Sequence, residues 1–182
     1  MILEQTFIND LVILTPAVFE DERGYFFESY SKSKMLDLGI QIDFVQDNQS
    51  FSKRGTLRGL HYQNPPFAQT KLVRVLQGEI MDVAVDLRKD SPTYGKYFGL
   101  VLSAENKKQL LVPQGFAHGF SVLSETAMVS YKCDQYYNKP SEGGIRFDDA
   151  TLNIDWGMDL ADAIVSEKDL ILPTIENCNS QF

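Results

Sequence analysis

The stretch from Gly55 to Gly78, GTLRGLHYQNPPFAQTKLVRVLQG, decides the fold of this chain. Its last part, Lys71–Leu76, is a short run rich in Val and Leu that ends at the turn signal Gln77-Gly78. A second run of the same kind, Ile80–Leu87, follows directly. Short runs of this composition on either side of a glycine turn are typical of antiparallel β-strands. The stretch therefore predicts strands in the middle of the chain.

Three further runs extend the pattern toward the C-terminus: Tyr97–Leu102, Gln109–Val112 and Ala127–Cys133. Turn segments that contain Pro and Gly separate them. Many short strands at roughly even spacing predict an all-β fold, a β-sandwich or barrel of jelly-roll type. Helix signals occur only near the ends, at Ser31–Leu38 and at Ser166–Asp169, so we expect a few short helices there.

Length and composition are those of an ordinary globular protein. A chain of 182 residues with 43% hydrophobic and 23% charged residues is long enough to bury one sizeable core. We expect a single domain over residues 1–182, with a loose tail from about residue 176. No apolar run approaches the length of a membrane span, and the N-terminal residues do not look like a secretory signal. We therefore expect a cytoplasmic protein that does not interact with membranes.

The net charge of −8 opposes binding to nucleic acid or to an anionic membrane, because basic patches drive both. A small anionic ligand needs only a local cluster of cations, which these residues can supply: Arg23, Arg58, Lys71, Arg74 and Lys168. The two cysteines form no CxxC or Cys/His pattern. Neither a disulfide framework nor a structural zinc site is expected.

The chain has only two histidines, His61 and His118, and both lie among glycines and apolar residues. The pKa of imidazole is the nearest to neutral pH of any side chain, so these residues are the first candidates for moving a proton. Taken alone, each is better explained as a satisfied core or turn histidine. Their neighbours decide between the two interpretations.

The period of two along a strand groups further side chains by face. Lys71 would share a face with Val73 and Val75 and point into the sandwich. Such burial lowers the pKa of a lysine unless an anion compensates. Tyr131 would share a face with Val129 and also point inward.

Arg58 and His61 are three residues apart, so they would face opposite sides of a regular strand. A β-bulge adds one residue to a strand and changes which side the following residues face. If Arg58 and His61 serve one site, we expect Gly59 to mark such a bulge.

The spacing of five residues resembles the first sequence motif of the cupins: Gly55, His61, Gln63, Lys71 and Gly78. The segment Pro113–His118 resembles part of the second motif. Metal-binding cupins hold two His, a Glu and a further His at positions that here are His61, Gln63, Lys71 and His118. An ammonium group in place of the carboxylate opposes binding of a divalent cation. We therefore expect a cupin barrel without a metal or other cofactor.

A narrower resemblance extends in order from about residue 10 to residue 170. Its motifs are Asp21–Glu28, Phe44–Asn48, Leu57–Gln63, Lys71–Val75, Asp82–Arg88, Ser91–Thr93, Gly115–Phe120, Tyr131–Lys132, Tyr136–Tyr137 and Ser166–Asp169. These segments resemble successive motifs of the dTDP-4-dehydrorhamnose 3,5-epimerase family. The resemblance implies a homodimeric, metal-free jelly roll of cupin type. It also implies conversion of dTDP-4-dehydro-6-deoxy-D-glucose to dTDP-4-dehydro-L-rhamnose, in dTDP-L-rhamnose biosynthesis.

The resemblance assigns four residues to catalysis. His61 would be the base that removes the protons at C3 and C5 of the keto sugar, and Asp169 would orient it. Tyr131 would be the acid on the opposite face of the ring, and Lys71 would stabilise the enolate oxygen at C4. These roles agree with chemistry, because a proton next to a ketone is too weakly acidic for imidazole alone and the developing charge must meet a preplaced donor.

The resemblance also assigns residues to substrate binding. His118 would donate a hydrogen bond to the sugar or its carbonyl, and Tyr137 would stack on the thymine, with Tyr136 as the alternative. The other expected contacts to the sugar nucleotide are Arg23, Phe26, Glu28, Gln46, Asn48, Arg58, Lys71, Glu142 and Lys168. Arginine forks fit phosphate oxygens, and an aromatic ring offers a base a stacking surface.

Each assignment has a structural alternative. Asp169 fits equally a residue of the turn that begins at Ser166, and Tyr131 and Tyr137 fit core aromatics. Arg23 beside a glycine fits a surface ion pair, and Lys71 fits a lysine whose stem alone is buried.

Three functional alternatives also remain at this point. The nearest is an epimerase that acts at C3 or C5 only and serves another deoxysugar. The others are a nucleotide-sugar binding module without catalysis and a metal-dependent cupin enzyme.

Overall fold

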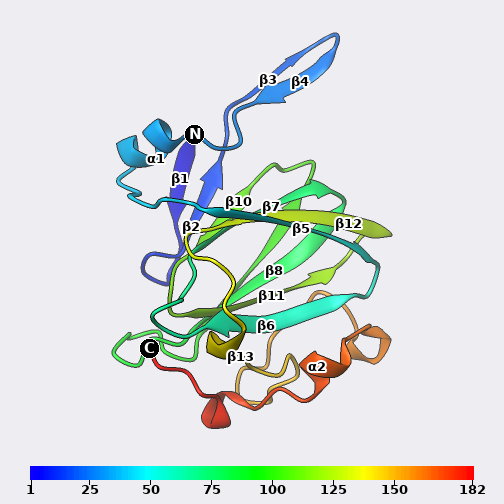
Figure 1. Cartoon of the computed structure of the whole chain (residues 1–182). Coiled ribbons are helices and arrows are strands. Elements are labelled where there is room, and N and C mark those ends of the chain that lie inside the picture. The colour runs from blue at the N-terminus through cyan, green and yellow to red at the C-terminus, as the bar shows by residue number, and fades with distance from the viewer.

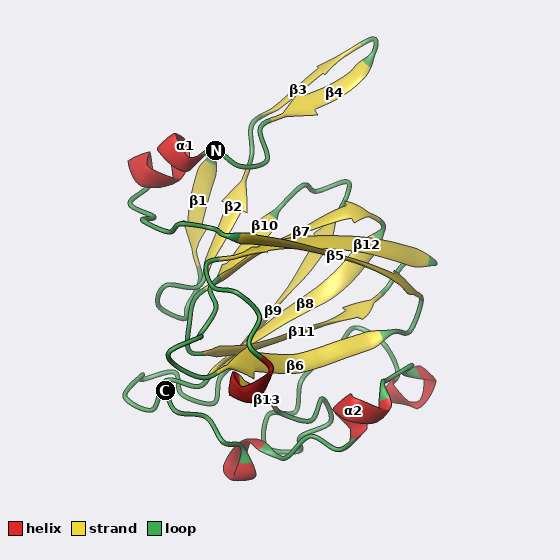
Figure 2. Ribbon diagram, viewed as in Figure 1, coloured by secondary structure: helices red, strands yellow, loops and turns green.

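The computed structural model describes residues 1–182 and consists mainly of two facing antiparallel sheets (Figures 1 and 2). The six-stranded sheet has the order β1 (Ile2–Gln5), β2 (Val12–Thr15), β10 (Gln109–Val112), β7 (Lys71–Gln77), β12 (Thr126–Cys133) and β5 (Gln46–Lys53). The five-stranded sheet has the order β13 (Glu142–Gly144), β6 (Leu57–Gln63), β11 (Phe116–Val122), β8 (Glu79–Asp86) and β9 (Tyr97–Ser103). This sandwich confirms the predicted all-β, cupin-type fold.

Helices are few and short. The two α-helices are α1 (Lys32–Asp37) and α2 (Glu167–Leu170), close to the predicted positions. Three single turns of 3₁₀ helix occur at Lys139–Ser141, Leu160–Asp162 and Ile175–Asn177. None of the helices is long and apolar enough to cross a lipid bilayer.

The main core lies between the two sheets. Alternate residues of each strand point inward, so Val73 and Val75 of β7 meet Ile80 and Ala84 of β8 in one cluster of 15 buried residues. Phe98 of β9 packs against this cluster from the side. The same alternation directs Lys71 and Tyr131 into the space between the sheets, as predicted from their faces.

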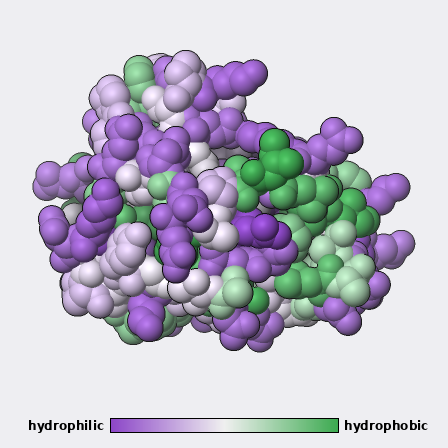
Figure 3. All heavy atoms as spheres, turned by 90° about the horizontal axis from the view of Figure 1, so that it is seen from below, coloured by the Kyte–Doolittle hydropathy of each residue, from purple (hydrophilic) through white to green (hydrophobic).

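Apolar residues also cover the outer face of each sheet. The segment from Ile145 to Phe182 packs over the five-stranded sheet, where Trp156 is 1% exposed. On the other side, Met35 of α1 packs on Leu14 and Leu72 of the six-stranded sheet. The C-terminal segment leaves four apolar side chains exposed: Leu160, Ile164, Leu170 and Ile171. Figure 3 looks onto this side of the molecule and shows an apolar area among polar residues.

The end of the chain, where the sequence predicts a loose tail from about residue 176, makes contacts with the rest of the protein. The Tyr62 hydroxyl donates to Asn179 Oδ1 at 2.8 Å, and the Gln181 amide donates to Asn64 Oδ1 at 3.0 Å. The Phe182 ring packs edge-on against Tyr62 with the ring centroids 6.2 Å apart. Composition suggested mobility here, but these contacts with β6 and the loop after it order the segment.

Strands β3 (Val18–Asp21) and β4 (Gly24–Phe27) form a separate two-stranded hairpin. Figure 1 shows this hairpin extending away from the sandwich. Its large side chains face solvent, since Phe19 is 65% exposed and Phe26 is 69% exposed. An isolated hairpin with exposed aromatic residues buries too little surface to be stable alone, so it is suited to packing against another surface.

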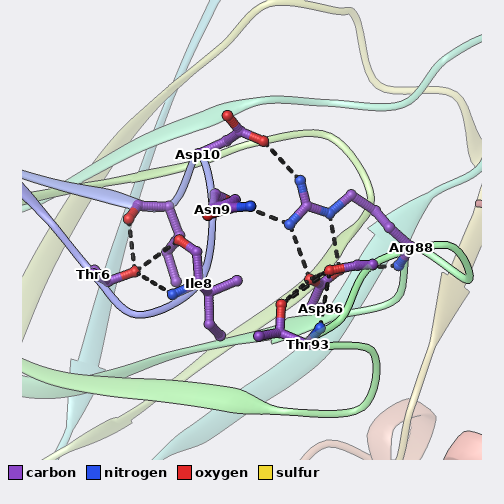
Figure 4. A network of polar contacts seen from close by, with 9 residues as sticks. Thr6, Ile8, Asn9, Asp10, Asp86, Arg88 and Thr93 are labelled. Atoms are coloured by element: carbon purple, nitrogen blue, oxygen red, sulfur yellow. Dashed lines mark hydrogen bonds and ion pairs between the residues drawn. The ribbon is translucent and has the colours of Figure 1, made fainter.

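A polar network closes one end of the sandwich (Figure 4). Asp86, at the end of β8, accepts hydrogen bonds from the Arg88 guanidinium and from the hydroxyls of Ser91 and Thr93. Arg88 also donates to Asp10 at 2.9 Å, which ties the β1–β2 turn to the strand. Both oxygens of Asp86 are therefore used, and the carboxylate is fully satisfied although it is not exposed to solvent.

Candidate active site

A β-bulge places Arg58 and His61 on the same side of β6. His61 pairs with His118 and Arg58 pairs with Phe120, so two residues of β6 stand opposite one residue of β11. Gly59 has a φ of 121°, and a Cβ there would lie 2.6 Å from a backbone atom of the facing strand. Only glycine fits this position. The bulge predicted at Gly59 is confirmed.

The bulge turns both side chains toward a cavity of about 580 Å³ between the sheets. The five-stranded sheet contributes Arg58 and His61 from β6 and His118 from β11. The six-stranded sheet contributes Lys71 from β7 and Tyr131 from β12. His61 and Tyr131 thus reach one space from opposite walls, and Lys71 lies on the wall of Tyr131.

Asp169 contacts His61 directly. Its Oδ1 lies 2.7 Å from His61 Nε2, and the Gly59 amide donates to its Oδ2 at 3.2 Å. Ser166 accepts a hydrogen bond from the Asp169 amide, so Ser166 caps α2 while the Asp169 side chain is free to bind His61. Burial alone would raise the pKa of Asp169, but the hydrogen bonds from His61, Gly59 and Ser166 hold it below its usual value.

This geometry fixes the orientation of the His61 ring. An ionised carboxylate only accepts hydrogen bonds, so His61 Nε2 carries the proton and Nδ1 keeps its lone pair. The His61 side chain is 30% exposed, and its ring lines the cavity. The arrangement is that of a base held by a carboxylate.

Lys71 and Tyr131 have pKa values shifted by their surroundings. Burial lowers the pKa of Lys71, while the nearby carboxylates of Asp82 and Glu142 act in the opposite direction. Lys71 Nζ has one hydrogen bond, 3.5 Å to the carbonyl of His61, so the ammonium retains donors for a ligand. Burial raises the pKa of Tyr131, which keeps its phenol protonated at neutral pH.

A second cavity of about 310 Å³ joins the first, because both are lined by His61, Lys71 and Tyr131. Of the residues expected at the nucleotide, four line this second cavity: Gln46, Asn48, Tyr137 and Glu142. The Tyr137 hydroxyl donates to Glu142 Oε2 at 3.1 Å, and Lys168 contacts Oε1 of the same carboxylate at 2.5 Å. Tyr136 does not line either cavity and is 64% exposed, which favours Tyr137 as the stacking residue.

Three residues expected at the substrate do not line these cavities. Arg23 and Phe26 lie on the projecting hairpin, and Glu28 follows it. Arg23 is paired with Asp21, and Glu28 forms an ion pair with Lys34 at 2.8 Å. Within one chain, the hairpin and the cavity are separate features.

Gln63 is held by the protein itself. Its side-chain amide donates to the carbonyls of Phe67 and Tyr136, and its oxygen accepts from the Asn138 amide at 2.8 Å. No group of three or more His, Cys, Asp or Glu side chains is arranged to hold a metal ion. In this structure Gln63 connects two loops beside the cavity.

The sequence predicts no role for one residue beside the site, Asp82, although it opens the motif Asp82–Arg88. Asp82, in the middle of β8, lies 2.9 Å from Nε2 of His118. The available signal was a carboxylate inside the apolar run Ile80–Leu87, on the face of Ile80 and Ala84. A charge at a position predicted to be buried needs a partner, and period two alone does not reveal which one.

The model of the dTDP-4-dehydrorhamnose 3,5-epimerase family matches residues 5–177. The chain belongs to this family. An epimerase of that name from Salmonella typhimurium is 50% identical over 177 residues, which cover 97% of this chain and 96% of the relative.

Solved structures of epimerases from this family have the same fold. The epimerase from Elizabethkingia anophelis has a TM-score of 0.93 at 56% identity, with 97% of each chain covered. The Legionella pneumophila epimerase, whose structure contains dTDP-4-keto-L-rhamnose, has a TM-score of 0.92 at 46% identity, with 96% of this chain and 93% of that chain covered.

Proposed function

We propose that this chain is a dTDP-4-dehydrorhamnose 3,5-epimerase that inverts C3 and C5 of dTDP-4-dehydro-6-deoxy-D-glucose. Family membership supports the reaction class and the substrate. The observation that carries the mechanism is the position of His61 and Tyr131 on opposite walls of one cavity. Inversion of a carbon requires removal of a proton from one face and delivery of a proton to the other.

The proposed reaction begins with His61 taking the proton at the carbon beside the C4 ketone. Asp169 holds the ring in the required orientation and stabilises the imidazolium that forms. The negative charge moves to the C4 oxygen, where the ammonium of Lys71 stabilises it between the sheets. Tyr131 then donates its proton from the opposite wall, and the carbon is inverted.

The joined second cavity is the proposed nucleotide site. Tyr137 of this cavity offers a flat ring for the thymine, and Arg58 and Lys168, which line the first cavity, offer positive charge for the diphosphate. Gln46 and Asn48 supply amide groups on the inner face of β5. These local cations explain how a chain with a net charge of −8 can bind a dianion.

We also propose that the working enzyme is a homodimer. Arg23, Phe26 and Glu28 are expected to contact substrate but do not line the cavities of their own chain. The projecting hairpin with its exposed aromatic residues fits a contact with a second copy. In the proposed dimer each hairpin completes the site of its partner.

Mixing two inactive variants tests this arrangement. H61N lacks the base, and a variant with R23A and F26A lacks the hairpin contacts. If hairpins serve the partner's site, a mixed dimer contains one intact site and activity returns on mixing. If each hairpin serves its own chain, mixing restores nothing. Light scattering of the wild-type protein should give a mass twice the chain mass of 20.6 kDa.

We further propose that the enzyme acts as a single domain in the cytoplasm, because a charged nucleotide sugar does not cross a bilayer unaided. No metal or other cofactor takes part in the proposed mechanism, since Lys71 performs the electrostatic role at C4. Activity is then expected to survive dialysis against a chelator. Loss of activity that added metal restores would contradict this part of the proposal.

Turnover in heavy water tests the reaction itself. The double epimerase should incorporate deuterium at both C3 and C5 of the product, as measured by NMR and mass spectrometry. Incorporation at one carbon would indicate a single-site epimerase. Binding of dTDP without any exchange would indicate a binding module.

A further inference from the structure

The site contains a second pair of histidine and carboxylate, formed by His118 and Asp82. His118 Nε2 lies 2.9 Å from Asp82 Oδ1, and the two residues come from the paired strands β11 and β8. Asp82 is 0% exposed and His118 is 8% exposed. His118 is also the backbone partner of His61, so the two histidine pairs lie side by side in the five-stranded sheet.

The contact determines which ring nitrogen of His118 faces the cavity. An ionised carboxylate is an acceptor only, so Nε2 carries the proton that Asp82 accepts. Nδ1 has no hydrogen-bond partner in the protein, yet it is not among the side-chain atoms that are sealed from solvent. Because His118 lines the main cavity, Nδ1 opens into that cavity with its lone pair available.

A purely structural role does not explain Asp82, because its burial lowers the stability of the fold. It lies between the inward-facing Ile80 and Ala84 of the main core, and its Oδ2 is buried without a partner. A buried carboxylate with an unused oxygen destabilises a fold. The nearby ammonium of Lys71 compensates part of this charge and is itself kept more basic by Asp82. Asp82 therefore serves two groups that face the same cavity.

We propose that Asp82 is a positioning residue of the epimerase: it fixes the tautomer of His118, so that Nδ1 accepts a hydrogen bond from a ring hydroxyl of the hexose. This inference rests on the proposed function and deepens it. It also changes the role expected for His118 from donor to acceptor. His118 does not line the second cavity, where the thymidine is proposed to bind, so Asp82 acts on the sugar and on turnover and leaves dTDP binding alone.

The isosteric variant D82N tests the proposal, because an asparagine can either accept from or donate to Nε2 and no longer fixes the tautomer. We expect a loss of kcat of about 10- to 100-fold, in the range for residues that orient a functional histidine. The dissociation constant of dTDP should stay within about two-fold of wild type. A drop in kcat within two-fold, or an equal loss of dTDP binding, would overturn the role.

Asp86 provides the matched control. It lies four residues further on the same face of β8 and is equally buried, but it pairs with Arg88 away from the cavity. D86N should destabilise the protein and leave kcat of the folded enzyme unchanged. If D82N and D86N reduce kcat equally, Asp82 has only a structural role.

A spectroscopic measurement on the wild-type protein does not depend on how D82N folds. With two histidines in the chain, ¹⁵N-histidine labelling gives two imidazoles, which H61N assigns. His118 should be protonated at Nε2 and unprotonated at Nδ1, and D82N should change this pattern for His118 alone. Protonation at Nδ1 in the wild type would overturn the inference. If the tautomer is as expected but the wild type does not epimerise, the proposed function fails instead.

Discussion

Two buried carboxylates on β8, Asp86 and Asp82, are held in opposite ways. Asp86, at the closed end, receives hydrogen bonds on both oxygens from Arg88, Ser91 and Thr93. Asp82, in the middle of the strand beside the cavity, has one partner and a buried oxygen with none. Both lie on the same face of β8, so the strand itself does not cause the difference.

The two carboxylates have different roles: Asp86 connects parts of the fold, and Asp82 belongs to the binding site. A fully satisfied carboxylate rigidifies the place where the β1–β2 turn meets β8. Around the cavity, Lys71, Tyr131 and the two histidine rings retain donors and acceptors that the protein leaves unused. Unused polar groups in an enclosed space stabilise a ligand more than they stabilise the fold. Substitutions around the cavity should therefore alter turnover, and those at the closed end should alter stability.

The largest effect is expected for H61N, which removes the proposed base. We expect kcat to fall by about 10³-fold or more, because loss of a general base costs about 10²- to 10⁴-fold. The free energy of unfolding should change by less than about 1 kcal/mol, since His61 is partly exposed. Steady-state kinetics and urea unfolding measure the two quantities. A variant with a lowered free energy of unfolding but an unchanged specific activity would contradict the assignment.

Y131F should separate removal of a proton from inversion. Without the phenol on the opposite wall, His61 can still take a proton and return it to the same face. We expect epimer formation to fall by about 10²-fold while deuterium exchange with retained configuration persists. NMR of the recovered sugar nucleotide in heavy water distinguishes the two outcomes. Equal loss of exchange and inversion would mean that Tyr131 is needed before the proton is removed.

D86N tests the closed end. Removing the charge leaves Arg88 without its main partner, and we expect a loss of about 2 kcal/mol in the free energy of unfolding. Chemical denaturation at neutral pH measures this loss. Unchanged stability would show that the network in Figure 4 adds little to the fold.

The free energy of unfolding of the same variant should also depend on pH in a different way from that of the wild type. Burial alone would raise the pKa of Asp86, but the bonds from Arg88, Ser91 and Thr93 hold it below its ordinary value of 3.8. Its stabilising contribution is thus complete above that value and is lost as the pH falls through the lower pKa of the folded state. The difference in unfolding free energy between wild type and D86N should shrink below about pH 4. A constant difference down to pH 2 would contradict this explanation.

The smallest effect is expected from deletion of residues 179–182. It removes the bonds to Tyr62 and Asn64 and the packing of Phe182, while residues 179–182 themselves line neither of the two cavities. We expect a loss of about 1 kcal/mol and unchanged kcat, as measured by thermal unfolding and kinetics. A large loss of turnover would show that the end of the chain contributes to the structure of the active site.

The sequence predicted the features that depend on the two-residue alternation of a strand and on the conformational freedom of glycine. Alternation placed Lys71 and Tyr131 inside, and the conflict between Arg58 and His61 pointed to the bulge at Gly59. These inferences need only the backbone geometry of a strand. The resemblance added Asp169, which no spacing rule places next to His61.

The features that the sequence did not reveal depend on long-range contacts. The docking of the tail requires Tyr62 and Asn64, more than 100 residues earlier in the chain. The partner of Asp82 depends on which strands become neighbours in the sheet. The position of Arg23 and Phe26 depends on the direction in which the hairpin extends from the sandwich. The composition of the hairpin does not predict that direction.

The covering of the five-stranded sheet has a consequence for synthesis of the protein. The side chains that close the outer face of this sheet, among them Ile145 and Trp156, belong to residues 145–182. A ribosome that has released only the strands leaves Leu60, Val83 and Val85 exposed to solvent. During that interval the uncovered apolar face favours aggregation, so residues 145–182 protect the newly made sheet as soon as they emerge.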